Sequence, residues 1–245
     1  VFLVGHVTKA GGIAGPKTLE HIVDTVLYFE GAGDVDHRVL RATKNRFGGV
    51  DEIGVFRMTA AGLLPVSNPS ELFLGDRVSH GSGCAVTSIV EGSRPLLVEI
   101  QALAARASYG AAQRVSSGFD QKRLALLLAV LEKRASLPLG QLDVFLNVVG
   151  GLRIIETAVD AAVAAALISA VRDTPISSDT IVLGEIGLGG ELRPVGQLER
   201  RLAEAARMGF TRALVPRRNA GAGEKPPLRV TEIPSVAALL EQLFV

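Results

Sequence analysis

A lysine and an arginine two residues apart, Lys44 and Arg46, are the side chains in this sequence best suited to bind an anion. They follow an alternating apolar run, Val39 to Ala42, which predicts a strand. Side chains two residues apart on a strand point to the same side, so the two cations would lie next to each other. Such a pair suits a phosphate group or a nucleic-acid backbone. An arbitrary pair of this kind is more often a solvated strand end.

The composition describes a globular protein of one or two domains. The chain has 245 residues, of which 48% are apolar and 21% charged, so each domain can bury its own core. The formal net charge is only +1, and any binding of nucleic acid must therefore come from a local basic patch.

Several kinds of site are excluded by the residue inventory. The single cysteine, Cys84, allows neither an internal disulfide framework nor a cysteine-based zinc site. The four histidines show no metal-ligand spacing, and no apolar run is long enough to span a bilayer. We expect a cytoplasmic protein that contacts no membrane.

The sequence contains no G-x-x-x-x-G-K-[ST] loop, the motif that cradles the phosphates of ATP. It opens on an apolar run, Val1 to Val4, that predicts a strand buried on both faces and has no initiator methionine. We expect the chain to be the C-terminal part of a longer protein, and not to bind ATP productively alone.

The first 62 residues predict one short helix followed by an antiparallel meander. The spacing of Leu19, Ile22 and Val23 predicts the helix, at 18–24. Runs rich in strand-forming residues predict three strands, at 26–29, 38–43 and 52–58. Lys44 and Arg46 would then lie at the tip of a hairpin, clear of their own core.

Residues 63–83 are rich in proline, serine and glycine and show no sustained periodicity, which predicts a linker. We place a domain boundary near residue 78, giving domains at 1–78 and 79–245. In the second domain the sequence predicts an α+β arrangement of helices and strands. A nearly all-apolar, alanine-rich helix is expected at 156–171, and this composition indicates that it is buried. Its other helices are expected at 120–135, 198–208 and 236–243, and its strands at 85–91, 94–103, 143–149, 180–187, 190–193 and 213–216.

The string Lys44-Asn45-Arg46-Phe47-Gly48 matches the pentapeptide signature of the bacterial RadA/Sms family of RecA-like DNA recombination and repair ATPases. The strand and glycine-rich loop beginning Gly5-His6-Val7-Thr8-Lys9 also resemble a RecA-type core. The resemblance covers essentially the whole chain. It implies an α/β RecA-like ATPase core, present as its C-terminal part, followed by an α+β Lon protease-like domain.

The resemblance also implies roles for single residues. Lys44 and Arg46 would be fingers that contact the nucleotide held by the next subunit, a contribution of about 10³ to 10⁵ in rate where such fingers are known. The same pair would alternatively grip DNA in the ring channel, and the sequence does not separate the two roles. His6 would sense the γ-phosphate, and Lys9 would lead into a DNA-facing loop.

The second domain resembles the Lon proteolytic domain around Gly184 to Gly196. Matching that pattern places Ala158 at the catalytic serine position and Glu199 at the catalytic lysine position. A Ser–Lys dyad needs a lysine to take the proton of the serine, so the resemblance implies a proteolytically inactive domain.

An inactive protease domain would still be able to bind DNA. Arg94, Arg153 and Arg193 are the candidate contacts, and in the Lon fold the loops of the last two converge. Arg200-Arg201 and Arg217-Arg218 are further basic pairs expected to be exposed. Only 4% of residues are aromatic, which favours contact with the DNA backbone over base stacking.

The family implies a hexameric ring that uses ATP and Mg²⁺, bound by the parent protein, to drive branch migration of single-stranded or branched DNA together with the RecA recombinase. The family's four-cysteine zinc motif is missing, so zinc is not expected in this chain. Two alternatives stay open: an oligomerisation scaffold that does not touch DNA, and a peptidase with an unrecognised nucleophile.

Overall fold

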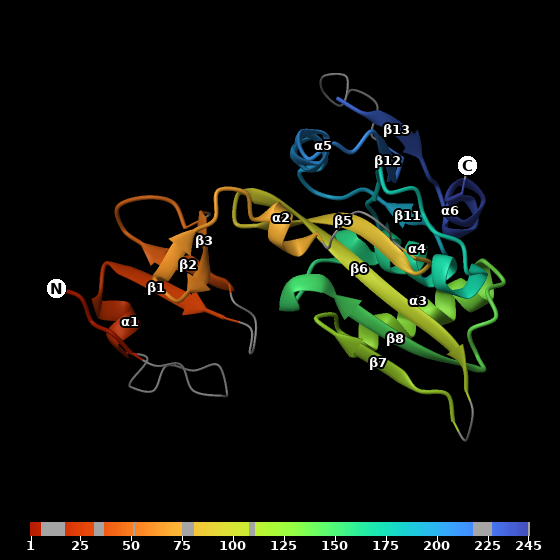
Figure 1. The fold of residues 1–245 in the computed structure, drawn as a ribbon, viewed down its shortest axis with the longest axis horizontal. Coiled ribbons are helices and arrows are strands. Elements are labelled where there is room, and N and C mark those ends of the chain that lie inside the picture. Colours follow the sequence, from red (N-terminus) through yellow and green to blue (C-terminus); the bar gives the residue numbers. More distant parts are fainter. Residues whose placement is uncertain are drawn as a thin grey trace. The chain divides into compact units, whose positions relative to one another are not determined.

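The computed structural model describes residues 1–5, 18–31, 37–50, 52–74, 81–107, 111–217 and 227–244, and Figure 1 shows their elements. The chain forms two compact units, each of which is described below by itself. The first unit contains residues 1–67 with the turn at 91–94, and the second contains 68–90 and 95–245.

The first unit is built around a four-stranded antiparallel sheet in the order β1-β2-β3-β4. The predicted meander is therefore confirmed, with Leu40 lying opposite both Phe29 and Gly54. A short helix, α1, precedes it as expected. The element bounds are α1 (Thr18–Ile22), β1 (Thr25–Glu30), β2 (His37–Asn45), β3 (Ile53–Thr59) and β4 (Gly62–Pro65).

The apolar run Val1 to Val4 is not the buried strand that its composition predicts. Residues 1–5 have no regular structure, and the side chains of residues 1–4 are exposed. A strand buried on both faces needs a pairing partner, and none of the described strands pairs with this segment. The prediction was wrong for the chain as it stands.

The second unit holds a seven-stranded mixed sheet in the order β13-β12-β9-β5-β6-β8-β7. Strand β13 is parallel to β12, β12 to β9 and β9 to β5, as is β7 to β8, whereas β6 and β8 are antiparallel. The unit is thus a mixed α/β structure. The strands are β5 (Cys84–Glu91), β6 (Arg94–Arg106), β7 (Arg114–Ser117), β8 (Leu142–Val148), β9 (Thr180–Val182), β12 (Arg212–Val215) and β13 (Arg229–Glu232).

Helix α3 (Gln121–Arg134) forms where the sequence predicts it. Its N-cap residue Asp120 accepts a hydrogen bond from the backbone N–H of Arg123 at 2.8 Å, which satisfies one of the free donors of the first turn. The leucines predicted to share one face, Leu124, Leu127, Leu128 and Leu131, are all buried. The 3.6-residue period thus identified the core face of this helix correctly.

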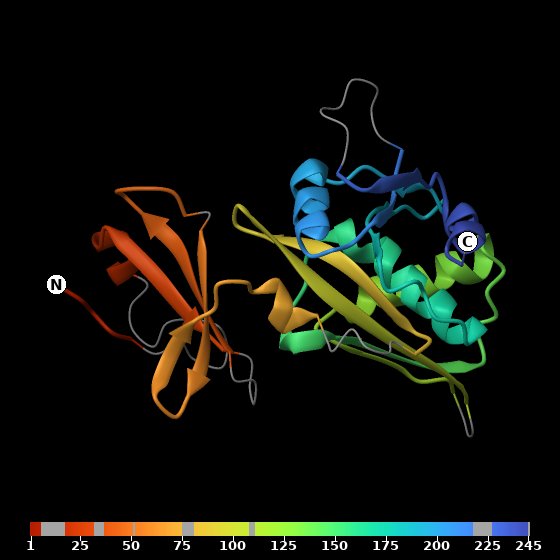
Figure 2. The same cartoon turned by 45° about the horizontal axis from the view of Figure 1, so that its top comes forward.

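Helix α4 (Asp160–Arg172) is the buried centre of the second unit. Residues 161–168 are fully buried, as their alanine-rich apolar composition predicts. Helix α4 contacts both α3 and α6 (Val236–Gln242), and Figure 2 shows the three helices gathered together. The α-helix begins four residues later than expected, because residues 157–159 form a 3₁₀ turn first.

Helix α5 (Leu198–Arg207) packs its residues Leu202 and Ala205 into a cluster with sheet residues such as Ile181 and Val215. The alternate sheet residues Val182 and Leu214 point to the opposite face and are also fully buried. This part of the sheet is therefore covered on both sides.

The predicted strand at 180–187 is divided into two. Its first part is β9, in the large sheet, and its second part is β10 (Glu185–Ile186), which pairs with β11 (Leu192–Arg193) in a small hairpin. The break lies at Gly184, whose φ of +150° favours glycine, and a Cβ there would crowd its neighbours at 3.1–3.3 Å. The break allows Glu185 to leave the large sheet.

The segment expected to be a linker contains two ordered elements, β4 and the short helix α2 (Ser70–Phe73). Ser70 is fully buried, donates from Oγ to Glu204 at 2.8 Å and accepts from the N–H of Leu97 at 3.2 Å. These contacts place α2 in the second unit, so the division at residues 67 and 68 comes earlier than the boundary we expected near residue 78.

Candidate functional site

Lys44 lies at the end of β2, and its ammonium group is used within its own unit. Nζ donates to the backbone carbonyl of Glu20 at 3.0 Å and to that of His21 at 3.1 Å. These carbonyls end α1, where the last turn of a helix leaves its oxygens without intrahelical partners. The structure therefore gives Lys44 a positioning role, that of holding the end of α1 against β2.

Arg46 follows β2 directly, and its guanidinium is far more accessible. Its side chain is 76% exposed, and its only ion pair among the described residues is with Asp24, itself 53% exposed, at 3.2 Å. Exposed ion pairs contribute little because water screens both charges. Both Lys44 and Arg46 thus contact the segment that runs from α1 into β1.

Asn45, between the two cations, organises the turn that presents Arg46. Its Oδ1 accepts from the N–H of Phe47 at 3.2 Å, and its Nδ2 donates to the carbonyl of Gly49 at 3.2 Å. The backbone N–H of Arg46 also donates to the carbonyl of Asp24 at 2.9 Å. The turn thus fixes the direction in which the Arg46 side chain starts. His6 and Lys9 lie outside the described residues.

A pocket of about 270 Å³ opens in the second unit beside Ala158. Its walls come from the end of β5, the segment before α4, β10 and the segment that leads into α5. The lining residues are Val90, Glu156, Thr157, Ala158, Glu185, Pro194, Val195, Gly196, Gln197 and Arg201.

The pocket does not hold the residues of a Ser–Lys protease. Ala158 is buried in its wall, whereas Glu199, in the first turn of α5, is exposed and does not line the pocket. The only hydroxyl among the lining residues belongs to Thr157, which donates to Glu185 at 2.7 Å. None of the described residues that line the pocket is a lysine able to take a proton from it.

Arg201 and Glu156 form an ion pair at one wall of the pocket. Arg201 is 3% exposed, and its Nη2 lies 2.7 Å from Oε2 of Glu156, with Nη1 3.1 Å from Oε1. Arg201 also donates to the carbonyls of Gly196, at 2.9 Å, and Ser88. We expected an exposed basic pair at Arg200-Arg201, and for Arg201 this was wrong. The sequence contained a signal that Arg201 is buried. Arg201 lies three residues after Leu198 and four before Ala205, which places it on the apolar face of α5.

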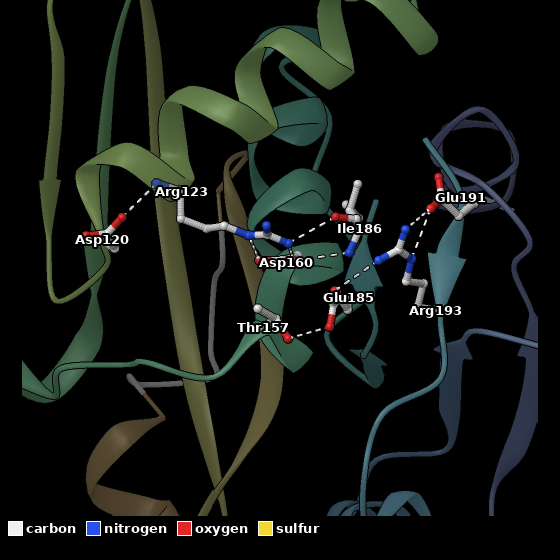
Figure 3. Close-up of polar contacts among 8 residues, drawn as sticks. All are labelled: Asp120, Arg123, Thr157, Asp160, Glu185, Ile186, Glu191 and Arg193. Atoms are coloured by element: carbon white, nitrogen blue, oxygen red, sulfur yellow. Dashed lines mark hydrogen bonds and ion pairs between the residues drawn. The ribbon is translucent and has the colours of Figure 1, made fainter. Parts of the chain in front are cut away.

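A second buried ion pair fixes the β10–β11 hairpin, as Figure 3 shows. Asp160, in the first turn of α4, is fully buried and accepts from the guanidinium of Arg123 on α3 and from the N–H of Ile186 at 3.1 Å. Arg123 in turn donates to the carbonyl of Ile186 at 3.0 Å. Burial raises the pKa of the Asp160 carboxyl, and the bonds from Arg123 and Ile186 oppose that rise.

The hairpin carries Glu185 and Arg193 next to each other (Figure 3). Arg193 donates to Oε1 of Glu191 from Nε at 3.0 Å and from Nη2 at 2.6 Å, and its Nη1 lies 3.7 Å from Oε1 of Glu185. Hydrogen bonds from backbone N–H groups, and then the bond from Arg193, lower the pKa of Glu191. Arg193 is thus already paired with carboxylates, which weakens it as a candidate contact for DNA.

The two other predicted DNA contacts differ in availability. Arg153 is exposed, and within the described part of the chain it makes no hydrogen bond or ion pair. Arg94 donates to the carbonyl of Ser67 at 3.1 Å and belongs, with the turn at 91–94, to the first unit. The described contacts of Arg193 do not include Arg153, so the structure does not join the two into one site.

Metal binding and membrane crossing find no support in the described residues. No three of their histidine, cysteine, aspartate and glutamate side chains gather closely enough to hold a metal ion. None of the helices in the described ranges has the length and apolar character that a bilayer crossing requires.

Comparison with known proteins finds similarity along the whole chain. A 221-residue segment, 90% of the chain, is 55% identical to the DNA repair protein RadA of Synechocystis sp. and covers 44% of that protein. The RadA proteins of Pseudomonas aeruginosa and Bacillus subtilis are 51% and 47% identical over 100% and 99% of the chain, which covers 54% and 53% of them. The chain therefore spans about half the length of the curated relatives it matches.

A family model described as subunit ChlI of Mg-chelatase matches residues 121–219. This segment runs from the start of α3 to just beyond β12, and so lies entirely within the second unit. It includes both buried ion pairs, Arg123–Asp160 and Glu156–Arg201.

Proposed function

The chain belongs to the RadA family of DNA repair proteins, and we propose that it is part of a DNA recombination and repair factor. In this proposal the parent protein is a cytoplasmic, hexameric ATPase that drives branch migration together with the RecA recombinase. ATP and Mg²⁺ are held by parts of the assembly other than this chain, because the chain has no phosphate-cradling loop. The first unit is the end of a RecA-like core, and the second is an inactive Lon protease-like domain.

The observation that carries the proposal is the unequal accessibility of the two cations of the pentapeptide. Lys44 donates to the carbonyls at the end of α1, whereas Arg46 is 76% exposed and, among the described residues, forms one weak ion pair. An exposed guanidinium on a fixed turn is suited to a phosphate that arrives from outside the unit. We therefore assign the anion contact to Arg46 and a positioning role to Lys44.

In the second unit, Arg153 is the arginine best placed to contact the DNA backbone. It is exposed and unpaired among the described residues, unlike Arg193. A contact of this type is insensitive to sequence and weakens with salt, because binding releases counterions from the phosphates. This contact accounts for an inactive protease fold that is retained beside an ATPase core.

The test is binding of fluorescein-labelled single-stranded and branched DNA to the chain, measured by fluorescence anisotropy between 50 and 200 mM salt. Arg153→Ala, and Arg46→Ala if its guanidinium contacts DNA, are each expected to reduce the slope of log affinity against log salt by about 1. The matched controls, Arg57→Ala and Arg229→Ala, remove exposed arginines of the same two units and should leave the slope unchanged. Absence of salt-dependent binding by the wild type would refute DNA contact by this chain.

The same variants separate the two roles of Arg46. If it contacts the nucleotide of a neighbouring subunit, Arg46→Ala leaves DNA binding by the chain unchanged. The matching substitution in a full-length RadA protein then lowers ATP hydrolysis by about 10³ or more. If it contacts DNA, the anisotropy titration changes, and ATP hydrolysis without DNA does not.

A second candidate function, self-association, is favoured by one apolar row on the sheet of the second unit. Leu103, Phe145 and Val115 are cross-strand neighbours on β6, β8 and β7, and are 60%, 37% and 47% exposed. Contiguous exposed apolar side chains are typical of contacts between protein chains. Light scattering of the wild type and of Phe145→Ser tests this: a loss of the oligomer in the variant supports a scaffold role, and a monomeric wild type excludes it.

A further inference from the structure

The pocket beside Ala158 has no part in the proposed DNA contacts, yet it is a formed cavity with a defined chemistry. Its volume of about 270 Å³ lies just below the range for ligand pockets, roughly 300–1,000 Å³. It therefore suits one side chain or a small molecule. Four of its lining residues, Val90, Ala158, Pro194 and Val195, are apolar, and two, Glu156 and Glu185, carry carboxylates.

The carboxylate of Glu156 is already satisfied by protein groups. It accepts from Arg201 at 2.7 and 3.1 Å and from the N–H of Val90 at 2.9 Å. Arg201 is the only cation among the lining residues. Its guanidinium also donates hydrogen bonds to the backbone carbonyls of Gly196 and Ser88. The pair is thus electrically neutral and offers neither a free cation nor a free anion to a ligand.

The carboxylate of Glu185 keeps free capacity. Its Oε2 accepts from Thr157 at 2.7 Å, whereas its Oε1 accepts no hydrogen bond from the described residues. Arg193 lies 3.7 Å from Oε1, too far for a good hydrogen bond, and Arg123 acts on the carboxylate only through its charge. Arg193 gives its short bonds to Glu191 instead (Figure 3). Because two carboxylates and one guanidinium line the pocket, its lining residues carry a net charge of −1.

The pocket wall formed by Gly196 and Gln197 is held in a fixed shape. Gln197 has left-handed backbone angles, φ 56° and ψ 34°, which are uncommon for a residue with a side chain. The Arg201 bond to the carbonyl of Gly196 holds this turn in place. Gly196 lines the pocket, and a Cβ there would meet no atom within 4 Å, so a larger side chain can be placed at this position.

We propose that this pocket binds an organic cation: a primary ammonium or guanidinium group on an aliphatic stem. The stem packs against Val90, Ala158 and Val195, and the cationic head donates to Oε1 of Glu185. Such a hydrogen bond is charge-assisted, and partial burial reduces the screening that weakens exposed pairs. The ligand is the lysine or arginine side chain of a polypeptide, or a free polyamine. This activity is separate from the DNA contacts of Arg46 and Arg153.

The test is a titration of the ¹⁵N-labelled 245-residue chain, followed by amide chemical shifts. Three probes are compared: Nα-acetyl-L-lysine N-methylamide, its neutral isostere Nα-acetyl-L-norleucine N-methylamide, and spermidine. We expect saturable binding of at least one cation, with a Kd on the order of 1 mM, and at least about tenfold weaker binding of the norleucine compound. Tighter binding of the lysine compound assigns the site to polypeptide side chains, and tighter binding of spermidine assigns it to polyamines.

Two variants and one control locate the binding. Glu185→Gln keeps the shape and the acceptor for Thr157 but removes the charge, and should weaken cation binding about tenfold. Gly196→Val fills the open space without backbone strain and should abolish binding, while its circular dichroism spectrum stays that of the wild type. Glu199→Gln removes an exposed carboxylate on the adjoining helix turn and should change nothing. Absence of saturable cation binding, or equal binding by wild type and Gly196→Val, would overturn the proposal.

Discussion

Replacing Glu156 by alanine leaves the guanidinium of Arg201 buried without its counter-ion. Arg201 is 3% exposed and keeps only its bonds to the carbonyls of Gly196 and Ser88. Loss of one partner of a buried ion pair costs about 3–5 kcal/mol. The side chain of Glu156 is 30% exposed, which admits some water to the site. We therefore expect a loss of folding free energy at the lower end of that range, about 3 kcal/mol.

The measurement is unfolding in guanidinium chloride, followed by circular dichroism. With a denaturant slope of about 4 kcal/mol per molar, the expected loss lowers the midpoint of the second unit by about 0.7 M. Replacing both partners, as Glu156→Leu with Arg201→Met, should recover most of the loss, because no charge then stays buried. If Glu156→Ala costs less than about 1 kcal/mol, the ion pair is not the buried contact that we infer.

Three further outcomes follow from single contacts. Lys44→Ala removes the donor to the end of α1 and should destabilise the first unit by about 1 kcal/mol in a urea titration; an unchanged midpoint would contradict the positioning role. Hydrogen bonds from Ser177 and Thr211 lower the pKa of Asp179 below its ordinary 3.8, so its stabilising effect is present above pH 3.8 and is lost as pH falls through the lowered value. Asp179→Asn should therefore destabilise the protein at pH 7, and the loss should shrink as pH falls below 3.8; a loss that does not change with pH would refute this. Burial, and then the charge of Glu99, raises the pKa of the Cys84 thiol from 9.0 to about 11, so alkylation by iodoacetamide at pH 7 should be about a hundredfold slower than that of a cysteine peptide. A rate within threefold of the peptide, read by mass spectrometry, would show that Cys84 is not desolvated.

Periodicity predicted the helices well because their apolar faces are continuous. The leucines of α3 and the alanine-rich run of α4 are buried as the sequence indicates. Strands β7 and β13 were missed, since each has four residues, lies at an edge of the sheet and contains no buried position. Such short edge strands are defined by pairing with distant residues, which the local sequence does not contain.

The candidate site was less predictable than the fold. The resemblance to the Lon proteolytic domain drew attention to the region of Ala158. It did not identify the carboxylates of Glu156 and Glu185 that line the pocket there. Glu156 was placed inside a helix, whereas it lies in extended backbone before the 3₁₀ turn, where its carboxylate reaches Val90 and Arg201. Asp160 gave a usable signal, because a carboxylate in an otherwise apolar helix requires a buried partner. Which arginine serves it, Arg123, depends on how α3 packs on α4.

The strand order of the second unit also bears on how the protein can be made and shortened. Strands β12 and β13 come last in the sequence, yet β12 pairs directly with β9 inside the sheet. Until residues 212–215 have left the ribosome, β9 presents an unpaired edge bearing Ile181 and Val182, which the finished sheet buries completely. A nascent or proteolysed chain that stops before Arg212 is therefore a template for aggregation, and expression with a chaperone, or truncation no earlier than residue 232, avoids exposing it.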